Sequence, residues 1–372
     1  MEAIAAGANV EIVHQSILDL GISSSSLATD ASSLVTDALM TACTHGHVHI
    51  VQYLLDAGAD VKARSNKALL LACRNGHSKV VQLLLANGAD TKARNNQAIL
   101  LASEHGYPKI VKLLADAGAN PKVYDNEALL LACKQGHPAT VKCLLDAGAD
   151  ATARDNMALQ IACVKDYSKI ARHLLDAGAD VHAKDDKALM LACKYGHPAT
   201  VKCLLDAGAN VKVQNHSALM TACIFGHDAV VQRLLEGGAD VHARSNQALV
   251  DACNYERIEV VNRLLDAGAL VHAQDNQALI TACRTGCLEI VNRLLDAGAD
   301  VHARNNKALW EACRYGSGRL VERLLAAGAD VLTTDKAAFR VATALGHTTV
   351  VDIIRGAARK ARRHGAKRAR KA

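Results

Sequence analysis

The stretch Asn-Lys-Ala-Leu-Leu-Leu-Ala-Cys-Arg-Asn-Gly-His-Ser-Lys-Val-Val-Gln-Leu-Leu-Leu-Ala-Asn-Gly-Ala-Asp, residues 66–90, returns with substitutions every 30 residues. Copies of its Ala-Leu pair lie at Ala38-Leu39, Ala68-Leu69, Ala98-Ile99, Ala128-Leu129, Ala158-Leu159, Ala188-Leu189, Ala218-Leu219, Ala248-Leu249, Ala278-Leu279 and Ala308-Leu309, with a weaker copy at Ala338-Phe339. A constant period of this kind is the signature of a repeat array, in which each repeat contacts only its neighbours. The sequence therefore predicts one elongated solenoid.

Each repeat divides into two short helices. Asn66 is a favourable N-cap for a first helix over about residues 67–74, and Gly76 supplies the left-handed position that ends it. A second helix follows His77, carries apolar residues at the helical period and ends at Gly88. Neither helix reaches the roughly 12 to 15 residues that an isolated helix needs for marginal stability. Stacking of neighbouring repeats must therefore provide the stability.

The predicted fold class is all-α, a helix-turn-helix solenoid in which short extended turns, the fingers, connect the repeats. Residues 1–36 are expected to form a degenerate N-terminal half repeat, or cap, with a Ser-rich loop that includes Ser32 and Ser33. Ten repeats fill residues 37–336, and residues 337–354 form a C-terminal capping repeat. Residues 355–372 are expected to form a basic disordered tail.

The order of these features resembles the ankyrin repeat: Gly-His between two helices, Val-Val-x-x-Leu-Leu in the second helix, then Gly-Ala-Asp-Val. The family's repeat has 33 residues and usually opens with Thr-Pro-Leu-His, whereas this chain has a period of 30 and opens with Asn-x-Ala-Leu. The three missing residues fall between Gly-Ala-Asp and Ala-Leu, so the family's β-hairpin fingers should be shortened to tight turns. This short repeat is similar to that of ankyrin proteins encoded by giant DNA viruses.

Nine of the 12 cysteines share one repeat position. They are Cys43, Cys73, Cys133, Cys163, Cys193, Cys223, Cys253, Cys283 and Cys313. Because free Cys packs as a small apolar residue, we interpret this position as buried core. Equivalent positions in stacked helices lie about 10 Å apart, too far for a disulfide, and no Cys-x-x-Cys occurs. We therefore expect no metal site and a reducing compartment.

Most of the 17 histidines are periodic as well. One set follows the glycine between the two helices, where we expect a structural hydrogen bond: His47, His77, His137, His197, His227 and His347. A second set lies in Val-His-Ala: His182, His242, His272 and His302. In many ankyrin proteins an Asn at that position is hydroxylated, so the resemblance implies hydroxylation of these four His side chains as one hypothesis, beside an unmodified structural role.

The sequence lacks the features of an enzyme. It contains no nonrepeating set of nucleophile, base and oxyanion donor, and no glycine-rich loop of the phosphate-binding kind. Its glycines fall at helix ends. We therefore expect a non-catalytic protein without a cofactor.

The informative positions are those that vary while the repeat frame stays constant. The position of Leu71 should face the concave, first-helix side, and it is apolar in five successive repeats and mostly polar or acidic in the following ones. The apolar members are Leu71, Leu101, Leu131, Ile161 and Leu191. This leucine stripe predicts either a partner-binding surface or a surface that neighbouring repeats cover.

The neighbouring positions of Arg74 and Asn75 carry a second pattern. They read Lys194-Tyr195, Ile224-Phe225, Asn254-Tyr255 and Arg314-Tyr315, so four of the nine Phe and Tyr residues share one repeat position. Aromatic and Arg side chains are enriched in binding hot spots. The resemblance implies that partners contact first-helix residues and finger tips. We therefore predict partner binding at Lys194, Tyr195, Phe225, Tyr255, Arg314 and Tyr315, with ordinary solvated residues as the alternative.

The basic residues are concentrated at the C-terminus. The formal net charge is +6, and residues 355–372 contain nine Lys and Arg and no acidic residue, so the rest of the chain carries −3. The clustered cations are Arg359, Lys360, Arg362, Arg363, Lys367, Arg368, Arg370 and Lys371. They predict a nuclear localisation signal, a nonspecific and salt-sensitive contact with nucleic acid, or a solvated terminus.

Two functions follow from these patterns. The first is a non-catalytic, monomeric interaction scaffold or adaptor that binds a partner protein on its concave face, with a viral effector acting on host proteins as one form of it. The alternative is a nuclear, nucleic-acid-associated protein that acts through its tail. No apolar run is long enough to span a membrane and no signal peptide is recognisable, so we expect an intracellular protein of the cytoplasm or nucleus.

Overall fold

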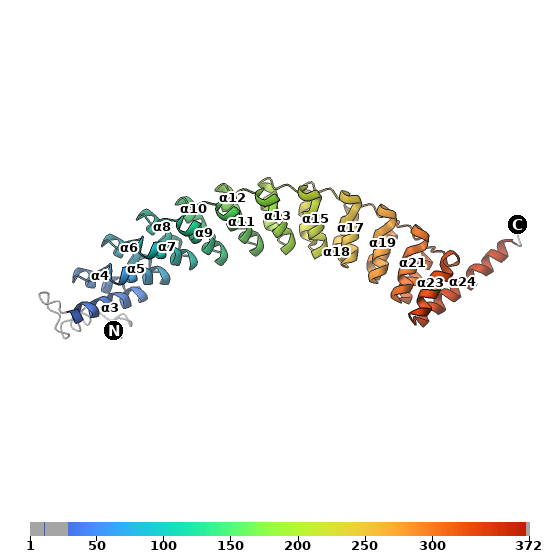
Figure 1. The fold of residues 1–372 in the computed structure, drawn as a ribbon, viewed down its shortest axis with the longest axis horizontal. Helices are drawn as coiled ribbons and strands as arrows, with labels where there is room; N and C mark the ends of the chain where they lie inside the picture. Colours follow the sequence, from blue (N-terminus) through green and yellow to red (C-terminus); the bar gives the residue numbers. More distant parts are fainter. Residues whose placement is uncertain (1–10, 12–28, 370–372) are drawn as a thin grey trace. The chain divides into compact units, whose positions relative to one another are not determined.

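The computed structural model describes residue 11 and residues 29–369. The chain divides into two compact units, Met1–Lys184 (unit 1) and Asp185–Ala372 (unit 2), and each is built from alternating helices (Figure 1). No β-strand occurs among residues 29–369. The predicted all-α fold class is therefore confirmed.

Each repeat consists of a first helix and a second helix. In unit 1 the first helices are α3 (Thr29–His45), α5 (Ala63–Asn75), α7 (Ala93–Glu104), α9 (Val123–Gln135) and α11 (Ala153–Lys165), and the second helices are α4 (Val48–Asp56), α6 (Ser78–Ala86), α8 (Pro108–Asp116), α10 (Pro138–Asp146) and α12 (Ser168–Asp176). The next first helix, α13 (Ala183–Tyr195), crosses the boundary between the units. In unit 2 the first helices continue with α15 (Val213–Phe225), α17 (Ala243–Asn254), α19 (Ala273–Thr285), α21 (Ala303–Tyr315) and α23 (Val331–Ala344), and the second helices are α14 (Pro198–Asp206), α16 (Asp228–Glu236), α18 (Ile258–Asp266), α20 (Leu288–Asp296), α22 (Gly318–Ala326) and α24 (Thr348–Ala369).

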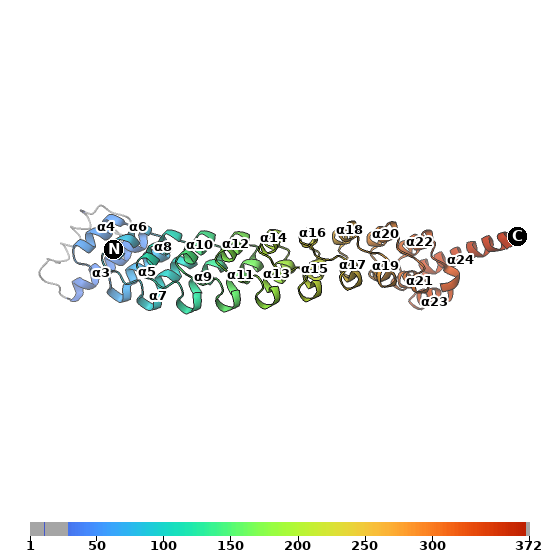
Figure 2. The ribbon, with the colours of Figure 1, turned by 90° about the horizontal axis from the view of Figure 1, so that it is seen from above.

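Within each unit, neighbouring first helices lie side by side, and so do neighbouring second helices (Figure 2). In unit 1, α5 contacts α3 and α7, while α6 contacts α4 and α8. In unit 2, α17 contacts α15 and α19, while α18 contacts α16 and α20. Each unit is thus a stack with two helix layers, and each helix buries its apolar side on the helices before and after it.

The constant residues of the repeat form the core between the layers. Leu69, Ala72 and Cys73 of α5 are fully buried, as are Val81 and Leu84 of α6. The small Ala and Cys side chains let the helix backbones approach closely, and Leu69 fills the space between successive helices. Truncation of such a leucine to alanine typically costs about 2 to 5 kcal/mol of stability.

The nine periodic cysteines are all buried in this core, as the sequence predicts. Burial raises the pKa of the Cys43 and Cys133 thiols to about 12, because a thiolate loses its hydration there. Cys143 and Cys287, which lie elsewhere in the repeat, are only partly buried. The periodic thiols are therefore core residues of low reactivity.

The fingers are short, as predicted, but their backbone is not extended. The finger runs into the N-terminal end of α5, where Arg64, Ser65 and Asn66 have φ values of 49°, 58° and 60°, so three consecutive residues lie in the left-handed region. The same triplet recurs at the N-terminal ends of α7, α9, α11, α13, α15, α17, α19 and α21. Asn, Asp and Ser fill most of the second and third places, which fits the enrichment of Asn and Asp in this region. The right-handed part of α5 then begins at about residue 67, as predicted.

The Asn at the third place of the triplet joins successive fingers. Oδ1 of Asn66 accepts a hydrogen bond of 2.7 Å from the backbone N–H of Asp90, in the next finger. The predicted N-cap role of Asn66 is therefore wrong, because its side chain is directed to the next finger. Asp186 and His216 replace this Asn in two repeats and still accept the equivalent bond, from Asn210 and Asp240.

The histidines of the inter-helix turn make a second joint between repeats. His77 Nε2 donates to the carbonyl oxygen of Thr44, in the preceding repeat, at 2.9 Å. Its ring lies against Gly46, whose φ of 78° and lack of a side chain allow this approach. His137, His227 and His347 make the same bond, so the predicted structural hydrogen bond is confirmed for them.

The two ends of the array differ from the sequence prediction. Residues 29–36 belong to α3, so Ser32 and Ser33 lie in a helix and not in the predicted loop; nothing between residues 29 and 45 is Gly or Pro. The rest of the predicted N-terminal half repeat, apart from residue 11, lies outside the described residues. At the C-terminus, α24 continues helically to Ala369 through the segment predicted as disordered, because Ala, Arg and Lys are strong helix formers.

The hydrogen bond between fingers predicts a stability difference between two substitutions. In unit 2, Oδ1 of Asn246 accepts from the N–H of Leu270 at 2.8 Å. We expect Asn246→Ala to lower the free energy of unfolding by about 2 kcal/mol, because it leaves that N–H without its acceptor. Asn246→Asp keeps an acceptor, as Asp186 does, and should cost less than half as much. Urea unfolding followed by circular dichroism measures both, and an equal loss would contradict the role of the bond.

The burial of the thiols predicts their order of reaction. With the native chain at neutral pH, Cys143 and Cys287 should react first with a thiol reagent such as DTNB, while the nine periodic cysteines react only as the array opens. All 12 cysteines should react at once in concentrated urea. Absorbance at 412 nm together with peptide mass spectrometry identifies the sites. Fast labelling of most periodic cysteines in the native chain would show that the core is not closed.

Candidate functional site

Four aromatic side chains occupy the C-terminal end of first helices in unit 2. Tyr195, Phe225 and Tyr315 are the last residues of α13, α15 and α21, and Tyr255 directly follows α17. Their exposed fractions are 46%, 45%, 52% and 47% in that order. We call these four residues the aromatic ridge. About half of each residue is thus accessible to solvent, at the same position of four repeats. The role of the ridge in binding stays a prediction.

Two ridge rings are held by histidines of the inter-helix turn. Tyr195 stacks on His197 with ring centroids 6.4 Å apart, and Phe225 stacks on His227 at 6.3 Å, with 17° and 9° between the ring planes. His227 in turn donates from Nε2 to the carbonyl oxygen of Lys194 at 3.0 Å. The joint that connects two repeats therefore also positions the exposed Phe225 ring.

Tyr315 is held in a different way because Ser317 stands where six other repeats have His. Its ring lies against Gly286 of the preceding repeat, in space that a side chain on Gly286 would occupy. The repeat of α19 has Thr285 at the ridge position. The Tyr315 ring therefore lies towards the preceding repeat, whose ridge position is occupied by the smaller, non-aromatic Thr285.

Cations flank the ridge. Lys194 Nζ lies 5.6 Å from the centroid of the Tyr195 ring, and Arg284 donates to Asn254 Oδ1 at 2.7 Å. Arg257 takes the turn position of His and donates from Nε to the carbonyl oxygen of Ile224 at 3.0 Å. The one acidic residue at these positions in unit 2 is the exposed Glu256. The surface around the ridge is therefore positive.

The acidic residues beside the ridge are drawn inward. Burial raises the pKa of the Asp251 carboxyl, although a 2.8 Å hydrogen bond from Gln247 opposes that shift. Glu311 is buried and forms ion pairs with Lys307 at 3.3 Å and Arg314 at 2.9 Å. The Glu311 carboxylate is therefore balanced by two cations of its own helix, and the Asp251 carboxyl is held by a neutral donor.

Sequence reasoning missed the cluster around Glu311. Lys307 Nζ lies 3.5 Å from the ring centroid of Trp310, and the Arg314 guanidinium lies 5.9 Å from it. The signal was present in the sequence, since residues 307, 310, 311 and 314 are spaced for one helix face. Arg314, predicted as a contact residue, is thus also a structural partner of Glu311.

The leucine stripe is neither covered nor fully exposed. Leu71, Leu101, Leu131, Ile161 and Leu191 are all of intermediate burial. The first four lie on α5, α7, α9 and α11 of unit 1, whereas Leu191 lies on α13 and belongs to unit 2. Unit 1 thus has a partly accessible apolar row where unit 2 has mainly polar residues.

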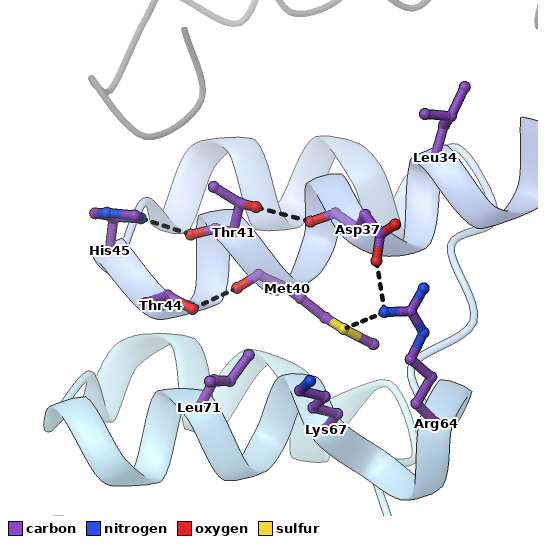
Figure 3. A pocket seen from close by; sticks show the side chains of 9 residues that line it. All are labelled: Leu34, Asp37, Met40, Thr41, Thr44, His45, Arg64, Lys67 and Leu71. Atoms are coloured by element: carbon purple, nitrogen blue, oxygen red, sulfur yellow. Dashed lines mark hydrogen bonds and ion pairs between the residues drawn. The ribbon is translucent and has the colours of Figure 1, made fainter. Parts of the chain in front are cut away.

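One member of the stripe, Leu71, lines a shallow hollow of about 510 Å³ between α3 and α5 (Figure 3). Arg64 crosses the hollow from the finger and forms an ion pair of 2.8 Å with Asp37. The close-up shows Lys67 and Leu71 of α5 opposite the α3 side chains. The hollow is therefore mixed in character, with an ion pair beside apolar atoms.

Arginines of the fingers donate to the backbone of the preceding finger. Arg94 donates to the carbonyl oxygen of Arg64 at 3.1 Å, Arg304 to that of Gln274 at 2.9 Å and Arg244 to that of Gln214 at 3.2 Å. This ladder between equivalent residues 30 positions apart was not foreseen from the sequence, which shows only that the fingers are basic. Each guanidinium thus helps to hold the finger of the preceding repeat.

The remaining predicted sites lie on the surface where the structure describes them. His182, His242, His272 and His302 are exposed, and their hydroxylation stays a prediction. In the tail, Arg359, Lys360, Arg362 and Arg363 are exposed on α24. Lys367 and Arg368 fall within the same helix, and Arg370 and Lys371 lie outside the described residues.

The described residues contain neither a cluster of metal ligands nor a membrane-spanning helix. No group of three or more His, Cys, Asp or Glu side chains among residue 11 and residues 29–369 is arranged to hold a metal ion. In the same part of the chain, no helix is both long enough and apolar enough to cross a membrane.

Solved structures that resemble this chain are ankyrin repeat domains. The domain of human ASB11 is 28% identical with a TM-score of 0.49, and the match covers 54% of this chain and 98% of that domain. The domain of Bcl-3, a member of the IκB protein family, is 29% identical with a TM-score of 0.43, covering 54% and 96%. An ankyrin repeat domain from Acinetobacter baumannii is 30% identical with a TM-score of 0.41, covering 46% and 98%. No curated protein matches the sequence.

The sequence also matches the family described as ankyrin repeats (3 copies). The matched segments are residues 1–95, 99–185, 184–245 and 249–335. They span most of the chain and include every repeat that carries a ridge residue. The chain therefore belongs to the ankyrin-repeat family.

Proposed function

We propose that this chain is a non-catalytic scaffold that binds a partner protein on the first-helix face of unit 2, at the aromatic ridge. Ankyrin repeats are in general non-catalytic domains that bind partner proteins. The observation that carries the proposal is the ridge itself, a row of half-exposed aromatic rings at one repeat position with cations beside them. Tyr, Trp and Arg are the residues that most often dominate protein interfaces.

The contrast with unit 1 supports this choice of face. At the ridge position, unit 1 has His45, Asn75, His105, Gln135 and Lys165, with no Tyr, Phe or Trp. The helices and turns around that position are the same in both units, so folding of the repeat does not require an aromatic ring there. A function outside the fold accounts for the rings in unit 2.

The half-buried leucine stripe of unit 1 is a separate candidate contact surface. Its side chains lie on first helices and expose part of their apolar surface. They would give unit 1 an apolar contact area of its own. On the resemblance of the 30-residue repeat to giant-virus proteins, we propose an adaptor or an effector towards host proteins as the biological form of this activity.

Loss of the ridge should remove the partner. We expect the variant with Tyr195→Ala, Phe225→Ala and Tyr255→Ala to lose its main partner in affinity purification with mass spectrometry, by at least tenfold in recovered protein. The matched control carries Asn75→Ala, Gln135→Ala and Lys165→Ala, the same position in unit 1, and should keep the partner. Circular dichroism establishes that both variants fold. An unchanged partner list for the ridge variant would place the binding face elsewhere.

The helical tail favours a second candidate function, a nuclear protein associated with nucleic acid. On α24, Arg355, Arg359 and Arg363 are spaced four residues apart, and all three are exposed. Residues at this spacing lie on one face of a helix, so the tail presents a row of cations that suits a phosphate backbone. No aromatic residue occurs in the tail, so binding would depend on charge and not on base stacking.

This second candidate has its own test. Arg359→Ala with Arg363→Ala should reduce the slope of log K against log salt for duplex DNA by about 1.8, because each lost phosphate contact removes about 0.9. Fluorescence anisotropy at several salt concentrations measures the slope, and microscopy of the tail-deleted chain tests nuclear retention. Partner capture through the ridge should survive both changes. Wild-type binding that does not depend on salt would exclude this function.

A further inference from the structure

The geometry points to the chemistry of the segment that the ridge binds, an inference that rests on the proposed function. We infer that it is an extended, acidic peptide in polyproline II conformation, with an apolar side chain at every third residue. It lies along unit 2 and crosses the first helices in succession. Tyr195, Phe225 and Tyr255 would receive its apolar residues i, i+3 and i+6.

The spacing of the ridge carries the first step. Neighbouring first helices of unit 2 pack against each other, as α15 and α17 do, and packed helices lie about 8 to 10 Å apart. Tyr195, Phe225 and Tyr255 lie in three successive repeats, so these rings recur at about that spacing. A polyproline II helix has three residues per turn and rises about 3.1 Å per residue, which gives about 9.3 Å per turn. One turn of such a peptide therefore matches one repeat.

Other regular conformations fit the ridge less well. A β-strand covers a similar length in three residues, but residues i and i+3 point to opposite faces. An α-helix repeats a face after seven residues, or about 10.5 Å, yet a bound helix needs a groove with several rows of apolar contacts. Behind the three rings lie Leu191, Thr221 and Asp251, of which only Leu191 is apolar. The single aromatic row therefore suits a narrow, extended ligand.

The positive charge beside the ridge favours acidic residues between the apolar residues of the bound peptide. Lys194, Arg257 and Arg284 lie beside the ridge, against the single exposed Glu256. Arg314 is paired with the buried Glu311 and adds no net charge, and the carboxyl of the half-buried Asp251 accepts a hydrogen bond from Gln247. The donors of Lys, Arg and Tyr also suit a polyproline II backbone, whose carbonyl groups have no internal partner.

Selection from random peptides tests this inference. Random 16-residue peptides on phage are selected on the full chain and counter-selected on the ridge variant with Tyr195→Ala, Phe225→Ala and Tyr255→Ala. We expect the enriched peptides to carry apolar residues at i, i+3 and i+6, Pro between them, and more Asp and Glu than Lys and Arg. Synthetic copies should bind the ridge variant about 30-fold more weakly.

Two further variants separate charge and position. Lys194→Glu with Arg284→Glu should weaken binding of the same peptides about tenfold at low salt and much less at high salt. Gln135→Ala with Lys165→Ala, at the ridge position of unit 1, should change it by less than about twofold. Exchange of a residue between the apolar ones for Pro should preserve binding, because polyproline II accepts Pro and an α-helix does not.

Each other outcome overturns the inference. Enriched peptides with apolar residues at i, i+3, i+4 and i+7, and loss of binding on introduction of Pro, would identify a helical ligand. Basic peptides, or no peptide that depends on the ridge, would contradict the proposed ligand chemistry. If the ridge variant still loses its cellular partner in these cases, the proposed function stands and only the ligand class is wrong. If the ridge variant keeps its partner, the proposed function fails as well.

Discussion

The hydrogen bond from the Asn side chain of one finger to the backbone of the next supports the rest of the fold. A 30-residue period leaves too few residues for the hairpin finger of a longer repeat, so the chain turns through three left-handed residues. Left-handed conformation costs an ordinary residue about 1 to 2 kcal/mol. The bond between Asn66 and Asp90, with its copies, and the burial of the stacked helices offset that cost. The finger guanidinium ladder adds a further connection on the surface.

The two joints between repeats also determine which positions can vary. The finger Asn and the turn His join neighbouring repeats at the two ends of the first helix. Residues between them on the exposed face are therefore not needed for these joints. The ridge occupies such a position, and unit 1 shows that His, Asn, Gln and Lys are accepted there as well. Phe225 is a direct example, since its ring rests on the same His227 that bonds to Lys194. A structural joint thus gives an exposed side chain a defined orientation.

Much of the fold could be predicted from the sequence, because a pattern that recurs in many repeats outweighs an unusual residue in any one of them. The helix pair, the buried Cys73 position and the bond made by His77 all follow from a pattern seen many times. The left-handed finger could not be predicted, because Asn66 before a helix equally indicates an N-cap and three consecutive left-handed residues are rare in any chain. The helix through Arg359 and Arg363 was missed because Lys, Arg and Ala are common to solvated tails and to helices. The half-burial of Leu101 depends on the distance between neighbouring helices, which the amino-acid sequence does not give.

The bond between fingers also bears on how such an array can grow. It joins a side-chain oxygen to a backbone N–H, so the donating residue can be of any type that has one; Leu270 donates as Asp90 does. Two repeats therefore need no matched pair of side chains to be joined at this point. A duplicated or exchanged segment of one full period would arrive with its own acceptor and meet a donor that every neighbour already has. Copying of whole periods in the gene can thus lengthen the array in a single step, and contact residues can diverge afterwards.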